Sequence, residues 1–269
     1  MRLTRTAAIV AAILLSLALP AAAVAKALLI DGSTSMFPLV SQLAAAYHKA
    51  THAPEPKVGQ GTSDVGVNDV HTGRVDIGDV SRNPLPADPK GLFFYKIAKD
   101  GVCVITNDAN PVKNLSPEEV KLIFTGNVRD WSEVPGSTLN GPIDLVDRVA
   151  SSGTQNAFQN IFLGEGTAIA PSAEAQQSNG LVQTKIRTDK NAIGFVSFAF
   201  TAGTNAVEYN GVACNLGNAK SGQYQGVRNF WMVTKGRAKG EAAKFIGWIT
   251  NSKNKIAHRI IGSEWVPIN

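Results

Sequence analysis

Short strand-like runs alternate with segments of helical periodicity along most of the chain. The early strand-like runs are residues 27–30, 57–60 and 75–78. Between them, residues 39–47 repeat apolar side chains every three or four positions, which predicts a helix, and residues 65–71 are predicted as a second, short helix. The alternation continues with predicted strands at 93–98, 102–106, 143–146, 192–200 and 224–234 and predicted helices at 117–124, 155–163 and 241–250. This order predicts an α/β fold with largely parallel sheets.

Three of the predicted strands end in the same kind of turn, in which a glycine stands beside serines and threonines before a helix. The turns are Gly32-Ser33-Thr34-Ser35, Gly61-Thr62-Ser63-Asp64 and Ser152-Gly153-Thr154, and Ser81-Arg82 follows a further predicted strand. Ligands of open α/β sheets bind at the carboxyl ends of the strands. We therefore expect these turns to converge on a ligand that accepts many N–H and O–H donors.

The third turn carries the most chemistry. Arg148 follows the strand-like residues 143–146, and residues 155–163 form the predicted helix after Thr154. A helix N-terminus presents free N–H groups and the positive end of the helix dipole, and an arginine adds charge, so the combination suits an anion. Taken alone, an ordinary capped helix with an arginine nearby is the commoner meaning of such a stretch. The accompanying turns favour the anion site.

Composition and charge restrict the possible functions. The chain has 269 residues, 25 glycines and a net charge of +5, and its basic residues are scattered, which gives no indication of nucleic-acid binding. His48 and His52 stand four apart on a predicted helix without a third ligand nearby, so a solvated helix face is favoured over a metal site. The nucleotide-binding and hydrolase motifs that we sought are absent. We expect no enzyme activity, no metal and no cofactor.

The N-terminal segment is typical of a signal peptide. Arg2 and Arg5 precede an apolar run at residues 7–19, and small residues follow, with cleavage favoured after Ala25. The run is too short for a membrane span, and no cysteine follows it to carry a lipid anchor. We expect a periplasmic protein that begins near Lys26.

The chain contains two cysteines, Cys103 and Cys214. Export permits a disulfide between them. Both also stand in apolar, strand-like surroundings, where buried free thiols are common. These surroundings favour free thiols slightly, and the pattern leaves the pairing open.

An ordered set of stretches resembles the periplasmic phosphate-binding proteins of ABC importers. The matching stretches are residues 32–39, 59–64, 75–82, 100–102, 110–131, 148–154 and 192–197. The resemblance implies a type II periplasmic binding fold, in which two α/β lobes joined by two crossing strands close on one phosphate. It places the first lobe at residues 27–103 plus 200–269 and the second at 104–199. The crossings are expected near residues 101–104 and 194–197.

The resemblance also implies the ligand-binding residues. Thr34, Ser35, Ser63, Ser81 and Arg82 match first-lobe donors, and the second-lobe donors are Arg148, Ser152, Gly153 and Thr154. Two positions depart from the usual pattern, since Ser151 replaces a glycine and Arg82 stands where some members have an aspartate. That aspartate accepts the phosphate proton and helps to exclude sulfate.

A carboxylate directed at the ligand would accept a proton from phosphate and repel sulfate, which has none to donate. Asp64, in a helix-start turn, is our candidate for this acceptor, with Asp79 and Asp147 as alternates. An ordinary helix cap is an equally good explanation of Asp64.

The resemblance implies a monomeric receptor that captures inorganic phosphate and delivers it to ABC permease subunits in the inner membrane. Other interpretations stay open: a receptor for another tetrahedral oxyanion such as sulfate, molybdate or arsenate, or a phosphate sensor for a membrane partner. An exported hydrolase is disfavoured because no nucleophile beside a base is evident.

Overall fold

The computed structural model describes residues 26–268, so the predicted signal peptide, residues 1–25, lies outside the described residues. The elements are β1 (Leu29–Gly32), α1 (Phe37–Thr51), β2 (Lys57–Val58), α2 (Ser63–Thr72), β3 (Ile77–Val80), β4 (Leu92–Thr106), β5 (Asn114–Leu115), α3 (Pro117–Phe124), β6 (Asp144–Arg148), α4 (Gly153–Phe158), β7 (Glu174–Gln176), α5 (Asn179–Thr188), β8 (Ala192–Ser197), β9 (Asn205–Ala206), β10 (Glu208–Tyr209), α6 (Leu216–Ser221), β11 (Val227–Lys235), α7 (Gly240–Thr250) and α8 (Lys255–Glu264). A π-helical turn, Gln159–Leu163, continues α4.

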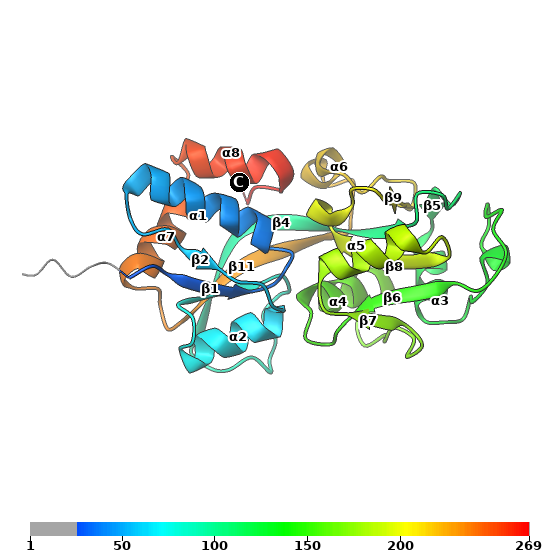
Figure 1. The fold of residues 1–269 in the computed structure, drawn as a ribbon, viewed down its shortest axis with the longest axis horizontal. Coiled ribbons are helices and arrows are strands. Elements are labelled where there is room, and N and C mark those ends of the chain that lie inside the picture. The colour runs from blue at the N-terminus through cyan, green and yellow to red at the C-terminus, as the bar shows by residue number, and fades with distance from the viewer. Residues whose placement is uncertain (1–25, 269) are drawn as a thin grey trace, which may run out of the picture.

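Two α/β lobes lie side by side along the long axis, with β4 and β11 running between them (Figure 1). The first lobe contains the strand order β2-β1-β3-β11-β4, and the second continues it as β4-β8-β6-β7. Pairing is parallel for β1 with β2 and β3, and for β6 with β7 and β8, whereas β4 and β11 are antiparallel to their neighbours. The predicted two-lobed α/β fold is confirmed.

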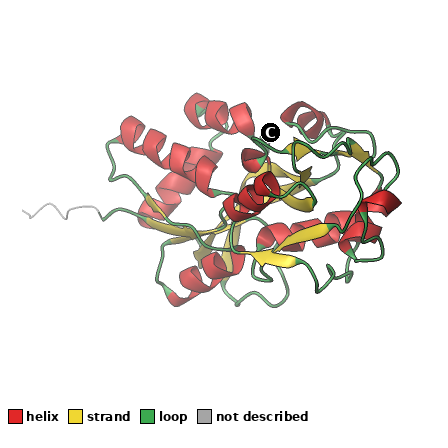
Figure 2. Ribbon diagram, turned by 45° about the vertical axis from the view of Figure 1, so that its right-hand side comes forward, coloured by secondary structure: helices red, strands yellow, loops and turns green. Residues whose placement is uncertain are grey.

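Strands occupy the centre of each lobe and helices the outside (Figure 2). In the first lobe α1, α7 and α8 cover one face of the sheet with a cluster that contains Leu43, Phe245 and Trp265. The buried valines of α2 pack on the other face, against Val80 and Val233. The second-lobe core is built largely of aromatic rings, with Phe158 and Phe195 stacked at a centroid distance of 3.9 Å.

The boundary between the lobes differs from the expected one. β9 pairs with β4, β10 pairs with β5, and Tyr224 belongs to the second-lobe core, so residues 205–224 lie with the second lobe. All of β8 lies in the second-lobe sheet, so the crossing expected at residues 194–197 is not there. The second connection is made at the start of β11, close to Val227. We propose a second lobe of about residues 102–226, because its core includes the loop after β8.

Cys103 and Cys214 form a disulfide, with their Cα atoms 5.6 Å apart. The slight preference for free thiols was therefore wrong. Apolar neighbours do not distinguish a buried free thiol from a buried disulfide. Here the disulfide itself lies in apolar surroundings, since Cys103 belongs to a buried cluster and Cys214 packs against it. The bond ties β4 to the segment before α6, within the second lobe.

No helix among residues 26–268 is long and apolar enough to cross a membrane.

One buried carboxylate in the first lobe has an unusual environment. Asp79, near the end of β3, is 1% exposed, and its Oδ1 atom has no hydrogen-bond partner among residues 26–268. Burial raises the pKa of this carboxyl well above its usual range, and the nearby charge of Asp31 raises it further. The neutral form is therefore the one that the fold accommodates.

This environment makes the stability of the protein depend on pH. Because the folded-state pKa of Asp79 is raised, its ionisation favours unfolding, and stability falls as pH rises above about 4, the ordinary carboxyl value. Asn cannot ionise, so the stability of Asp79→Asn relative to the unmutated protein should increase between pH 4 and pH 8. Urea unfolding at several pH values measures this difference. The exposed Asp108→Asn is the control, and a pH-independent difference for Asp79→Asn would contradict the account.

Candidate anion-binding site

The first lobe contributes a group of buried hydroxyls at the carboxyl ends of its strands. Ser33 follows β1 and donates from Oγ to Oγ of Ser81, after β3, at 2.7 Å. Ser63, the first residue of α2, accepts the backbone N–H of Ser81 at 3.0 Å. Thr34 and Ser35 lie in the turn before α1 and are also buried. The three chain segments therefore meet as the sequence predicts.

The second lobe contributes the turn after β6. Ser152 caps α4 and accepts the backbone N–H groups of Thr154 and Gln155 at 3.1 and 3.3 Å. Gly153 lies against the first lobe, where an added Cβ would come within 2.8 Å of Ser81 Oγ and still closer to Ser63 Oγ. A side chain at this position would hold the lobes apart. Glycine is required there for the close approach.

Hydroxyls of the two lobes touch. Ser35 Oγ lies 3.0 Å from Thr154 Oγ1. Asn179, at the start of α5, donates from Nδ2 to Thr34 Oγ1 and Ser35 Oγ, both at 2.9 Å. The backbone N–H of Asp64 donates across the same junction to the backbone carbonyl of Ser151, in the second lobe, at 3.2 Å. The structure thus has the two lobes closed on each other at the hydroxyl turns.

Arg148 is buried beside these hydroxyls without a counter-ion. Its Nε and Nη2 atoms donate to the backbone carbonyls of Gln176 and Gln177 at 3.1 and 3.0 Å, and Nη1 lies 3.5 Å from Thr154 Oγ1. Among residues 26–268 no carboxylate oxygen lies within 4 Å of this guanidinium. Burial lowers the pKa of Arg148 to about 10, and the charge of Arg228 contributes. A buried cation in this state favours an anion as its partner.

Arg228 is a second buried cation at the site, and it was missing from our prediction. It projects from β11 and donates from Nη2 to Ser35 Oγ at 2.7 Å and from Nη1 to the Ser81 carbonyl at 3.3 Å. Nε and Nη2 also pair with Oδ2 of Asp100 on β4, whose Oδ1 accepts from Ser197 Oγ. Burial lowers the pKa of Arg228 and raises the pKa of Asp100, because desolvation outweighs the pairing.

Two signals in the sequence pointed to the missed residues. Arg228, with Asn229, interrupts a predicted strand of β-branched and aromatic residues at 224–234. Asn179 follows Ser178 in another polar turn before a helix, and Ser178 caps α5 by accepting the N–H of Leu181. A charge inside a buried strand and a further hydroxyl-capped helix start are the patterns that could have identified them.

Arg82 and Asp64 do not join the cluster. The Arg82 guanidinium is buried between two carboxylates, with Nη2 at 2.8 Å from Asp64 and 2.6 Å from Asp88. The Asp64 side chain is 41% exposed. The structure therefore brings Thr34, Ser35, Ser63, Ser81, Arg148, Ser152, Gly153 and Thr154 together and places Arg82 and the Asp64 carboxylate in a separate ion pair.

The alternate carboxylates differ in their partners. Asp147 accepts the backbone N–H of Arg148 at 2.6 Å and the Gln155 amide at 2.7 Å, so both of its oxygens are engaged. Burial raises the pKa of Asp147 despite these hydrogen bonds. Asp79 is buried without a partner for Oδ1 among the described residues, as above.

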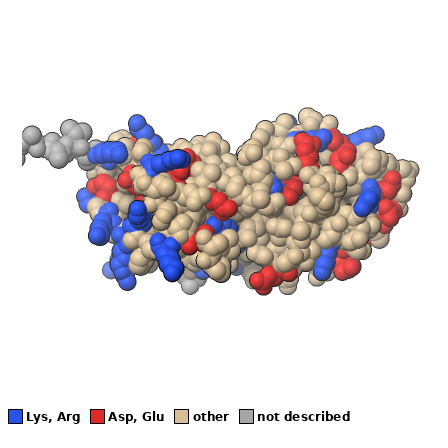
Figure 3. Space-filling view, turned by 90° about the horizontal axis from the view of Figure 1, so that it is seen from below, with Lys and Arg blue, Asp and Glu red and all other residues tan. Residues whose placement is uncertain are grey.

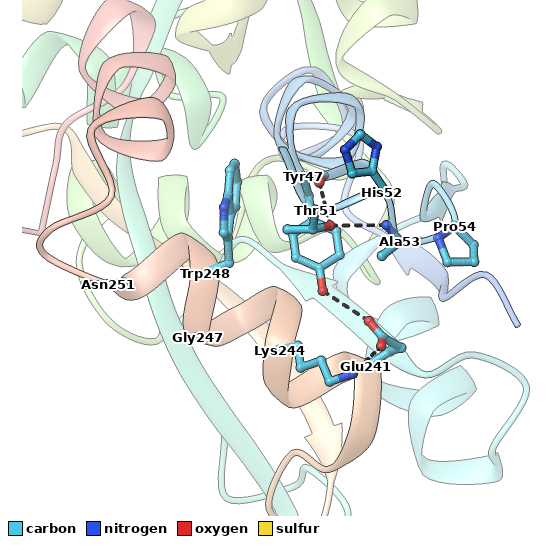
Figure 4. A pocket seen from close by; sticks show the side chains of 10 residues that line it. All are labelled: Tyr47, Thr51, His52, Ala53, Pro54, Glu241, Lys244, Gly247, Trp248 and Asn251. Atoms are coloured by element: carbon cyan, nitrogen blue, oxygen red, sulfur yellow. Dashed lines mark hydrogen bonds and ion pairs between the residues drawn. The ribbon is translucent and has the colours of Figure 1, made fainter. Parts of the chain in front are cut away.

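A cleft on the outside of the first lobe is separate from this cluster. It encloses about 620 Å³ between the C-terminal end of α1 and α7, where Tyr47 donates to Glu241 at 3.0 Å and Trp248 lies alongside (Figure 4). The hydroxyl turn lies at the opposite end of the 15-residue α1, roughly 20 Å away. Its acid and its amine, Glu241 and Lys244, pair with each other at 2.7 Å, so the cleft offers an anion no unpaired lysine or arginine.

The chemistry of the cluster is that of binding. Hydroxyls, an amide and two guanidinium groups all can donate, and charge-assisted donors of this kind bind oxyanions strongly. No group of three or more metal-ligating side chains occurs among residues 26–268.

Comparisons with known proteins identify the family of this chain. The PBP superfamily domain matches residues 19–253. The phosphate-binding protein PstS of Bacillus subtilis is 30% identical over 227 residues, which cover 82% of this chain and 74% of the relative.

Two solved structures have the same fold. A putative phosphate ABC transporter substrate-binding protein from Clostridium perfringens, solved with bound phosphate, has a TM-score of 0.83 and 28% identity over 91% of this chain and 100% of that one. An ABC-type phosphate transport receptor from Vibrio cholerae has a TM-score of 0.70 and 27% identity over 89% of this chain and 100% of that one. The chain therefore belongs to the PBP superfamily and, within it, to the family of the PstS phosphate-binding proteins.

Proposed function

We propose that this protein binds one inorganic phosphate between its lobes and delivers it to the membrane subunits of an ABC importer. The observation that carries the proposal is the buried Arg148, which has no carboxylate within 4 Å among residues 26–268 and lies beside hydroxyls from both lobes. The named relatives are phosphate-binding and phosphate-transport proteins, which supports phosphate as the anion.

The proposed ligands are drawn from both lobes. Thr34 and Ser35 would donate from the first lobe, and Arg148, Gly153 and Thr154 from the second. Arg228 and Asn179 extend this set, since both already donate to Ser35 Oγ. Ser63, Ser81 and Ser152 would hold the turns in place, because their hydroxyls are engaged with neighbouring groups.

We propose a non-enzymatic, monomeric receptor that acts in the periplasm after removal of residues 1–25.

A shift of the melting temperature with each member of an oxyanion panel tests the choice of ligand, because a ligand that binds only the folded state stabilises it. Phosphate should raise the melting temperature more than sulfate, molybdate or arsenate at equal concentration. A larger shift with another oxyanion would reassign the ligand, and no shift with any of them would reject the proposal.

Arg148 should dominate the affinity. Arg148→Gln keeps a polar group but removes the charge and the charge-assisted hydrogen bonds, so phosphate affinity should fall roughly a hundredfold. Titration calorimetry measures the change. Arg82→Gln is the matched control, because it also removes a buried arginine but one that is paired with Asp64 and Asp88. We expect that control to lose stability and to retain the affinity of the unmutated protein; equal losses of affinity in both variants would contradict the assignment.

Arg228 and Asp100 allow binding and stability to be separated. Arg228→Gln leaves Asp100 buried and unpaired, which should cost about 3–5 kcal/mol of folding stability. The double variant Arg228→Gln with Asp100→Asn removes both charges and should recover most of that stability, while phosphate affinity stays reduced. Urea unfolding and calorimetry give the two quantities. A double variant that binds phosphate as tightly as the unmutated protein would limit Arg228 to a structural role.

A further inference from the structure

Charge is divided unequally between the lobes. The first lobe, residues 26–101 and 227–268, contains 16 Lys and Arg and 10 Asp and Glu, which gives a net charge of +6. The second lobe, residues 102–226, contains 8 Lys and Arg and 11 Asp and Glu, which gives a net charge of −3. Seen from below, Lys and Arg gather on the first lobe, and acidic residues are more evident on the second (Figure 3). The excess positive charge therefore lies on the surface of one lobe.

Part of this charge lies in loops at the outer end of β4 and β11. The side chains of Lys90, Lys235, Arg237 and Lys239, which we call the basic tip, are exposed. Lys235 on β11 pairs with Leu92 on β4, and the backbone N–H of Gly236 donates to the Gly91 carbonyl at 2.7 Å. Lys235, Arg237 and Lys239 also line a hollow of about 340 Å³. The four cations thus belong to one patch.

The acidic groups around the basic tip already have partners. Asp69 pairs with Arg74 at 3.0 Å, and Glu241 pairs with Lys244 at 2.7 Å. Asp76, which lines the hollow, accepts the N–H of Leu29 at 2.8 Å. None of the four cations of the basic tip has a carboxylate oxygen within 4 Å among residues 26–268. Their charge is available to an external anion.

An exposed aromatic ring stands in the same patch. Phe93 is 39% exposed, and the Arg237 guanidinium lies 5.3 Å from its ring centroid. Gly91 and Gly236 have φ values of +82° and +70°, and the flanking Lys90, Lys235 and Arg237 are exposed. A projecting aromatic ring among unpaired cations is the combination that binds at a membrane interface, where the ring enters the headgroup layer and the cations meet anionic lipids.

We propose that the basic tip docks this protein on a bilayer surface that contains anionic phospholipid. The strand β4 separates the tip from the crossing, since Leu92 and Asp100 are eight residues apart, or roughly 25 Å in an extended strand. Docking by the tip leaves the hydroxyl turns and the crossing strands free. The proposal does not depend on the identity of the ligand held between the lobes.

Vesicle flotation with the exported, purified protein tests the docking. The protein should float with vesicles of phosphatidylglycerol and phosphatidylcholine at low salt, and should float far less with phosphatidylcholine alone or in 0.5 M NaCl. Each basic residue near an anionic surface strengthens partitioning by about fivefold, so the triple variant Lys235→Glu, Arg237→Glu and Lys239→Glu should weaken it by roughly a hundredfold or more. Phe93→Ala should weaken it by a smaller factor.

A matched variant separates the basic tip from net charge. Lys253→Glu, Lys255→Glu and Arg259→Glu make the same change in charge at exposed positions in and before α8, away from the tip. This variant should retain most of the partitioning, and both triple variants should keep the melting temperature of the unmutated protein. Equal losses in the two variants, or no flotation of the unmutated protein, would overturn the proposal. Salt-sensitive binding to purified permease subunits without binding to lipid would reassign the patch to a protein partner.

Discussion

The structure depends on the burial of two arginines whose charge is only partly balanced. Arg148 and Arg228 are 2% and 5% exposed, and the single carboxylate paired with either of them is Asp100, within residues 26–268. A buried charge is costly unless hydrogen bonds and an opposite charge compensate it. An anion between the lobes supplies both, because it accepts from the guanidinium groups and from the hydroxyls around them. This excess of positive charge, more than any single turn, defines the site.

Arg228 reaches the site from a crossing strand, whereas Arg148 stands at the end of β6 in the second lobe. Arg228 and Asp100 face each other on β11 and β4, where the strands pass from one lobe to the other, and Arg228 donates to first-lobe hydroxyls while Asp100 accepts from Ser197 of the second lobe. The other hydrogen bonds across the junction, such as that of Ser35 with Thr154, join neutral groups. Neutral hydrogen bonds contribute only about 1 kcal/mol each, so the anion would supply most of the free energy that favours closure.

Local patterns predicted the parts of the site that are continuous in the sequence. The turns at residues 32–35 and 152–154 follow strands and begin helices, and both occupy the expected junction. Arg82 follows Ser81 directly, yet its guanidinium pairs with Asp64 and Asp88, and the Ser81-Arg82 pair does not itself encode these contacts with other segments. Arg228 was missed because its position depends on the pairing of β11 with β4, which no local motif encodes. The lobe boundary and the disulfide also depend on contacts between distant segments, and an apolar context alone does not specify them.

A crystal structure of the protein with phosphate tests the central claim most directly. We predict one phosphate that is held by Arg148, by the turn at Gly153 and Thr154, and by Thr34 and Ser35 of the other lobe, with Arg228 within hydrogen-bond distance of the anion or of Ser35. A phosphate bound outside this junction, or contacted by one lobe only, would contradict it.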